Sequence, residues 1–271
     1  MSVDYVTAAG LRFAYLSQGA GPLALLFHGF PDTPHTWDAV APRIAAKGYR
    51  VVMPFMRGYR PTQIPAHDTD AMTLARDPIA LIDALGEKQA TLIGHDWGAA
   101  AVYGAVALAP ERVRKVFALS IPHPATLRAT PAKVWRVRHF LEFKLPTAAR
   151  RFAKNDFEAL RAICKRWSPD WNPGDAEFAA VRECFADPAS LNAAFGYYRA
   201  LSFGWPKALR NKTSVPAVVF YGSGDPITEP SDYERGRAMF TGDYTIEATG
   251  GGHFLHREDP EGFARKLLAH L

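Results

Sequence analysis

The feature that most constrains the fold is an apolar run that ends at a glycine-flanked aspartate and continues into small residues. Residues 91–99 read Thr-Leu-Ile-Gly-His-Asp-Trp-Gly-Ala, and residues 100, 101, 104 and 105 are alanine or glycine. This order predicts a strand, a tight turn and a closely packed helix, and such a turn would expose the Asp96 side chain above a sheet. An ordinary strand-to-helix turn with Asp96 as the helix N-cap fits the same residues. The partners of Asp96 have to separate these two interpretations.

Short apolar runs alternate with helical patterns around this segment, as is typical of a mostly parallel sheet that is covered by helices. Strands are expected at residues 11–17, 23–28, 49–53, 90–93, 113–119, 215–221 and 244–247. Helices are expected at residues 37–46, 73–85 and 99–109 and from residue 260 onward. The expected fold class is therefore α/β.

The alternation stops between residues 122 and 213, where the chain is helical, rich in aromatic residues and interrupted by prolines. We expect residues 1–121 and 214–271 to form one α/β core, with 122–213 inserted between two halves of its sheet as a helical cap. A length of 271 residues suits one domain that carries such an insertion.

Two later segments can supply partners for Asp96. His253 follows the last expected strand within Gly-Gly-Gly-His-Phe, a flexible loop that would present it as a base for activating water. Asp225 follows the strand at 215–221 within Gly-Ser-Gly-Asp-Pro, where it can hold His253 in one tautomer. The chain order Asp96, Asp225, His253 corresponds to nucleophile, acid and base. This triad favours the catalytic interpretation of Asp96.

A carboxylate nucleophile narrows the chemistry. Ionised Asp96 can attack an sp³ carbon of an epoxide or a halide without a base and form an ester on the enzyme. Water activated by His253 then attacks the aspartyl carbonyl carbon, where an oxyanion develops. His28-Gly29-Phe30-Pro31 follows an early strand, and the backbone N–H groups of Phe30 and Trp97 are the expected oxyanion donors. We expect a structural role for His28. Esterase and lipase activities are disfavoured, because attack of the Asp96 carboxylate on an ester substrate would give an unstable anhydride.

Composition argues against several other classes of protein, among them nucleic-acid-binding, metal-binding and membrane proteins. The formal charge is +5, but the densest basic cluster (128–166) contains aromatic and acidic residues, so we interpret it as a solvated helical face rather than a nucleic-acid site. Cys164 and Cys184 lack metal-ligand spacing, which favours reduced thiols in a cytoplasmic protein and leaves a single disulfide open. No metal or other cofactor is expected, since no further residue at metal-ligand spacing accompanies His253 and His256. Neither a signal peptide nor a membrane-spanning run is expected.

Together these segments resemble the epoxide hydrolase and haloalkane dehalogenase branch of the α/β-hydrolases. The resemblance spans nearly the whole chain and rests on residues 28–31, 57–59 (Arg-Gly-Tyr), 94–98, 225 and 252–254. It implies an α/β-hydrolase fold with a helical cap and an enzyme that converts a small apolar epoxide and water to a vicinal diol. The oligomeric state stays open, a homodimer included.

The cap should distinguish the members of this branch. Epoxide hydrolases use two cap acids, typically tyrosines, to protonate the epoxide oxygen. Residues 192–199 resemble the segment that bears the second tyrosine, which implies this role for Tyr198. Residues 139–146 resemble the first segment, but His139 stands in the place of the tyrosine. On one continuous helix Trp135, His139 and Phe143 would share a face, so a structural role for His139 is the alternative.

Dehalogenase interpretations remain open. A His and Tyr pair also resembles the fluoride-binding residues of fluoroacetate dehalogenases, yet no arginine follows Asp96, and Ser120 stands where those enzymes carry their acid. Haloalkane dehalogenases fit better, because Trp97 can donate its indole N–H to a halide. A frequent second halide donor, an asparagine after His-Gly, is replaced here by Phe30. A cap tryptophan could substitute for it: Trp135, Trp167, Trp171 or Trp205.

A non-catalytic ligand-binding relative is a third alternative, which the complete triad disfavours. The aromatic cap also predicts an apolar substrate pocket. The residues expected to line it are Phe30, Trp97, Trp135, Phe140, Phe143 and Phe195, with Phe203 nearby.

Overall fold

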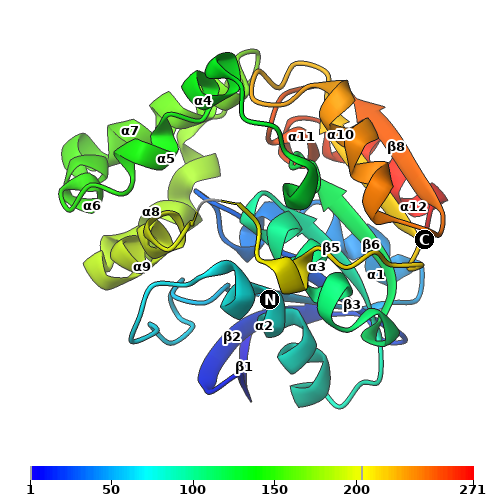
Figure 1. Cartoon of the computed structure of the whole chain (residues 1–271). Coiled ribbons are helices and arrows are strands. Elements are labelled where there is room, and N and C mark those ends of the chain that lie inside the picture. Colours follow the sequence, from blue (N-terminus) through cyan, green and yellow to red (C-terminus); the bar gives the residue numbers. More distant parts are fainter. Residues whose placement is uncertain (1, 203) are drawn as a thin grey trace.

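One sheet forms the centre of the molecule in the computed structural model, which describes residues 2–202 and 204–271. Its eight described strands follow the order β1-β2-β4-β3-β5-β6-β7-β8 (Figure 1). The β1–β2 and β2–β4 pairs are antiparallel, and every pairing from β4 to β8 is parallel. The strands are β1 (Val3–Ala8), β2 (Leu11–Gln18), β3 (Leu23–Phe27), β4 (Arg50–Pro54), β5 (Ala90–His95), β6 (Val113–Leu119), β7 (Ala217–Gly222) and β8 (Tyr244–Thr249). The predicted α/β class is confirmed.

The sequence predicts each of these strands except β1. This strand lies at the edge of the sheet, and most of its residues are exposed, including Val3 and Tyr5. Its short run of mixed residues lacks the continuous apolar character of the buried strands β3 and β5. A search of the sequence for apolar runs therefore misses an edge strand of this kind.

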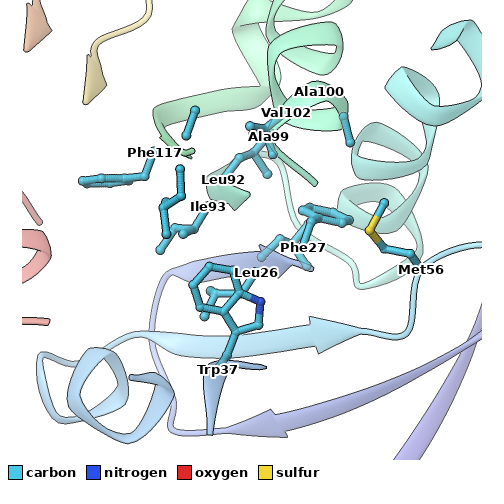
Figure 2. Packing of buried hydrophobic residues seen from close by; sticks show 14 of the residues in the cluster. Leu26, Phe27, Trp37, Met56, Leu92, Ile93, Ala99, Ala100, Val102 and Phe117 are labelled. Atoms are coloured by element: carbon cyan, nitrogen blue, oxygen red, sulfur yellow. The ribbon is translucent and has the colours of Figure 1, made fainter. Parts of the chain in front are cut away.

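Helices cover the sheet, and α3 is the most deeply buried of those beside it. The helices that cover the sheet are α1 (Ala41–Ala46), α2 (Ala71–Ala84), α3 (Trp97–Leu108), α10 (Pro230–Gly236), α11 (Leu255–Glu258) and α12 (Pro260–Ala269). Figure 2 shows Leu92 and Ile93 of β5 in one buried cluster with Ala99 and Ala100 of α3. Small side chains at the start of α3 allow this close approach, which fixes the turn between β5 and α3.

Between β6 and β7 the chain forms a separate group of helices, shown in green and yellow in Figure 1. These are α4 (Pro131–Arg136), α5 (His139–Glu142), α6 (Ala148–Phe152), α7 (Lys154–Trp167), α8 (Ala179–Ala186) and α9 (Pro188–Arg199). Phe203 lies outside the described residues. In the described part of the chain, no helix has both the length and the apolar character to cross a membrane. Cys164 and Cys184 are separate, buried thiols.

The predicted helical face shared by Trp135, His139 and Phe143 is wrong. Helix α4 ends at Arg136 and α5 begins at His139, so the break separates the first two side chains. Trp135 is 68% exposed, and its ring lies 4.6 Å from the guanidinium carbon of Arg138. His139 and Phe143 are buried. The expected substrate-binding role of Trp135 is therefore incompatible with its position on the surface.

Candidate active site

Asp96 occupies the turn between β5 and α3. Its backbone has φ 52° and ψ −117°, a conformation that costs energy for a residue with a side chain. Gly94 and Gly98 allow this turn, since a side chain on Gly94 would collide with the Gly98 backbone and one on Gly98 with the Phe27 carbonyl group. Although Asp96 stands at the N-cap position of α3, its side chain makes no capping hydrogen bond. The structure thus argues against the helix-cap interpretation.

The two carboxylate oxygens of Asp96 have different surroundings. Oδ1 accepts a hydrogen bond of 2.8 Å from the Phe30 backbone N–H, and Oδ2 lies 3.5 Å from Nε2 of His253. The loop carrying Phe30 approaches so closely that a side chain at Gly29 would collide with Asp96. Among the described contacts, the N–H of Trp97 makes no hydrogen bond to this carboxylate. Of the two expected oxyanion donors, only the Phe30 N–H therefore donates a hydrogen bond to the Asp96 carboxylate in the described structure.

The structure also brings His253 and Asp225 together, although 28 residues separate them. Nδ1 of His253 lies 3.3 Å from Oδ2 of Asp225, so the imidazole ring stands between two carboxylates. The Ile227 backbone N–H donates to Oδ1 of Asp225 at 2.7 Å and fixes this carboxylate. All three predicted triad residues therefore meet at the carboxyl ends of the strands that precede them.

Burial and charge together set the protonation of this group. Burial favours neutral His253, but the hydrogen bonds and charges of Asp225 and Asp96 outweigh it and raise the pKa of His253 to about 9. Burial likewise opposes ionisation of Asp96, yet His253, with smaller help from His95 and the Phe30 N–H, leaves the Asp96 pKa below its usual value. At neutral pH the ground state therefore pairs an ionised Asp96 with a charged His253.

The carbonyl group of His253 is held by two core residues. Nε2 of His95 donates to this oxygen at 2.9 Å, and Oγ of Ser120 donates to it at 2.6 Å. In the sequence Ser120 was notable only as the place of an absent acid, and His95 only as a residue beside Asp96. No sequence signal places either of them against the His253 backbone. Their contacts arise because the ends of β5 and β6 and the loop after β8 meet at one edge of the sheet.

The other two histidines considered above are structural. Nε2 of His28 accepts the Met56 N–H at 3.0 Å, in agreement with its expected role in the loop. Nε2 of His256 lies 2.6 Å from the Thr36 hydroxyl group, and this side chain is fully buried.

Tyr198, on α9, approaches the triad from the group of helices between β6 and β7. It is 1% exposed, and its ring centroid lies 5.2 Å from that of Trp97 and 5.5 Å from that of Phe30. Burial, with a further contribution from the charge of Asp96, raises the pKa of Tyr198 well above its usual value. The phenol therefore stays protonated and can donate a hydrogen bond.

His139 lies on the same side, with its ring centroid 6.1 Å from that of Tyr198. Burial, reinforced by the positive charge of Arg166, lowers the pKa of His139 to about 3, so the ring is neutral. Its Nδ1 atom is buried and has no hydrogen-bond partner among the described residues. The structure thus places a neutral imidazole with an unpartnered nitrogen near the Tyr198 phenol.

Aromatic side chains surround Phe30. The ring centroids of Phe143 and Phe195 lie 5.3 and 5.4 Å from that of Phe30. Phe140 contacts Tyr198, with 5.4 Å between ring centroids. Further cap residues that the sequence did not single out join this cluster, namely Phe152 and Phe185. Apart from Trp135, the expected apolar residues therefore gather near Asp96.

Comparison with known proteins identifies the family of this chain. The family model described as alpha/beta hydrolase fold matches residues 22–260. This chain belongs to that family.

Among curated relatives of this α/β hydrolase, Epoxide hydrolase A of Mycobacterium tuberculosis is 29% identical and covers 96% of this chain and 94% of its own length. An epoxide hydrolase of Caballeronia sordidicola is 42% identical over 120 residues, which are 43% of this chain and 36% of that protein. The crystal structure of Epoxide Hydrolase A from Mycobacterium thermoresistibile superposes with a TM-score of 0.83 at 25% identity, covering 100% of this chain and 98% of that one.

In this α/β hydrolase, the segment Arg57–Tyr59 connects the core to the helix that carries Tyr198. Arg57 forms a buried ion pair with Asp77, and the Arg57 carbonyl group accepts the Tyr197 hydroxyl at 2.9 Å. The Tyr59 ring packs against Tyr197, with 6.2 Å between centroids. The family resemblance marked this segment, but only the structure shows that it supports α9.

Proposed function

We propose that this α/β hydrolase is an epoxide hydrolase, which converts a small apolar epoxide and water to a vicinal diol through an ester on Asp96. The observation that carries the proposal is the state of Asp96: one oxygen is held by a backbone N–H while the other lies beside His253. A buried, protonated Tyr198 lies nearby and can donate to an epoxide oxygen. Relatives named epoxide hydrolase over most of this chain support this substrate class.

In the first step, Oδ2 of Asp96 attacks an epoxide carbon and the carbon–oxygen bond of the ring breaks. The departing oxygen takes the proton of Tyr198, and the neutral His139 ring supplies a second hydrogen bond. This pairing suits the reaction because an epoxide is a poor leaving group unless its oxygen is protonated as the ring opens. The aromatic surroundings favour an apolar substrate.

The second step depends on a change of charge. Alkylation neutralises Asp96 and removes one of the two carboxylates that raise the pKa of His253. His253 then releases its proton, through water, to the Tyr198 phenolate that ring opening left, and acts as a base on a water molecule, oriented by Asp225. Hydroxide adds to the ester carbonyl carbon, the oxyanion develops on Oδ1 at the Phe30 N–H, and the Trp97 N–H is the proposed second donor. The acyl–oxygen bond of the ester breaks, and the departing alkoxide takes the proton that His253 removed from water and leaves as the diol. The carboxylic acid left on Asp96 then returns its proton to His253.

We also propose that residues 122–213 act as a cap on a core formed by 1–121 and 214–271. The packing of Phe30, from the core, among Phe143 and Phe195 supports this division. A cytoplasmic location and a homodimer remain predictions.

The proposal is tested by offering the purified enzyme styrene oxide and, separately, 1-bromobutane, and by measuring diol and bromide. Diol formation from the epoxide is expected. A single turnover in ¹⁸O-labelled water should give a diol whose new oxygen is unlabelled, because it comes from Asp96. Bromide release without diol formation would instead indicate a dehalogenase, and neither product would point to a ligand-binding protein or another hydrolase activity.

A further inference from the structure

Three consecutive backbone N–H groups around His253 are hydrogen-bonded, and two of them bond to the end of cap helix α7. The His253 N–H donates to the Trp167 carbonyl oxygen at 3.0 Å, and the Phe254 N–H donates to Oγ of Ser168 at 3.2 Å. The Gly252 N–H donates to both carboxylate oxygens of Glu258 at 2.9 Å. The loop that carries the proposed base is thus attached to the cap as well as to the core.

Ser168 and Glu258 connect these attachments. The Ser168 hydroxyl donates to Oε1 of Glu258 at 2.6 Å while it accepts the N–H of Phe254. Ser168 is fully buried, and a side chain at Gly252 would collide with Ser168. The one polar atom of the Ser168 side chain, Oγ, therefore both donates and accepts a hydrogen bond, and its close contact with Gly252 leaves the loop little space to shift.

The neighbouring Trp167 extends this attachment to the proposed acids. Its ring centroid lies 5.1 Å from that of His253 and 4.8 Å from that of His139. One end of one cap helix therefore contacts the proposed base directly and also packs against a residue of the ring-opening step.

We infer that Ser168 and Glu258 are positioning residues for His253, and that through them hydrolysis of the ester depends on the placement of cap helix α7. The inference rests on the proposed function, because it assigns them to its second step. A general base must lie within hydrogen-bond reach of the water that it activates, and small displacements of such a group have large effects on rate. Asp96 is fixed by its own turn and by the Phe30 N–H, neither of which contacts Ser168, so its attack on the substrate should depend on Ser168 much less than hydrolysis does.

The decisive variant is Ser168→Ala, and Ser190→Ala is its matched control. Ser190 is also a fully buried cap serine that bridges to the core, since its hydroxyl donates to the Gly58 carbonyl oxygen at 2.9 Å and accepts the Arg60 N–H at 3.0 Å. Among the described hydrogen bonds, its hydroxyl group makes none to the His253 loop. Rapid mixing of each variant with styrene oxide, followed by acid quench and intact-mass measurement, gives the rates at which the ester forms and decays.

For Ser168→Ala we expect ester decay to slow about tenfold, the factor for one lost hydrogen bond to a charged group, while ester formation changes less than about twofold. The ester should then accumulate. Ser190→Ala should leave the ratio of the two rates unchanged. Glu258→Ala should slow decay as Ser168→Ala does, and Glu258→Gln, which retains a carbonyl oxygen for Gly252, should recover part of the rate.

Equal slowing of both steps in Ser168→Ala, or the same change in Ser190→Ala, would show a general effect on the fold and overturn the positioning role. Decay at the wild-type rate would overturn it as well. Absence of any ester in both the wild-type enzyme and His253→Gln would instead contradict the proposed function itself. Circular dichroism melting curves of each variant identify any that fail to fold, and in that case Glu258→Gln carries the test.

Discussion

The core and cap sides of the candidate site use opposite kinds of chemistry. On the core side, His253 is charged and lies between two carboxylates, and its backbone groups are hydrogen-bonded. On the cap side, Tyr198 and His139 are neutral and surrounded by aromatic rings. A further cation on the cap would add to the charge of His253 beside Asp96 and weaken this carboxylate as a nucleophile. The difference therefore indicates that charge is kept in the core, while the cap supplies neutral proton donors.

Removal of the Tyr198 hydroxyl group from the cap side should have the largest effect on the rate of the reaction. Tyr198→Phe should slow ester formation by about 10²- to 10⁴-fold, the range for a general acid, and slow ester hydrolysis much less. Tyr197→Phe is the matched control, because its hydroxyl donates to the Arg57 carbonyl group and not to the site. Pre-steady-state kinetics with styrene oxide separates the two steps. Equal slowing of both would count against Tyr198 as the acid.

Stability should depend on pH in opposite directions for the two histidines. The pKa of His253 is raised to about 9, so its stabilising contribution is full below the unfolded value near 6.5 and is lost as pH rises toward 9. The pKa of His139 is lowered to about 3, so stability is lost as pH falls below 6.5, by up to about 1.4 kcal/mol per pH unit. Urea unfolding of wild type, His253→Gln and His139→Leu between pH 5 and pH 9 measures both.

The wild type should lose its advantage over His253→Gln on the alkaline side, whereas His139→Leu should lose less stability than wild type on the acid side. The same pH dependence in all three proteins would remove the electrostatic distinction between core and cap.

The smallest effect is expected at Trp135. Because this side chain is 68% exposed, Trp135→Ala should leave KM for an apolar epoxide within about twofold and stability within about 0.5 kcal/mol. Phe143→Ala, on a buried neighbour of Phe30, should destabilise the protein by about 3–5 kcal/mol. Steady-state kinetics and urea unfolding test the pair. A large rise in KM for Trp135→Ala would return this residue to the site.

The triad could be predicted because each member follows a strand and is marked by adjacent glycines. Asp96, Asp225 and His253 each follow one of the parallel strands within a few residues, and parallel strands bring their carboxyl ends together. Tyr198 and His139 were found only through the family resemblance, since nothing local distinguishes them from other aromatic cap residues.

The remaining contacts could not be predicted, for identifiable physical reasons. Trp135 was misplaced because the break between α4 and α5 has no glycine or proline to mark it. Ser168 and Glu258 are 90 residues apart, and their hydrogen bond depends on how α7 meets the His253 loop. Polar residues of this kind are common in loops, so their roles become visible only when the chain is folded.

The central claim is that Asp96 is a carboxylate nucleophile whose ester is hydrolysed through His253. The most direct test exposes His253→Gln to styrene oxide and, in a separate sample, to 1-bromobutane, and measures the intact mass of the protein. The account predicts a gain equal to the whole epoxide that is absent when Asp96→Ala is added. No gain with the epoxide, or a gain that persists without Asp96, would contradict it, and a gain only from the bromoalkane, short by the mass of the halogen, would identify a dehalogenase.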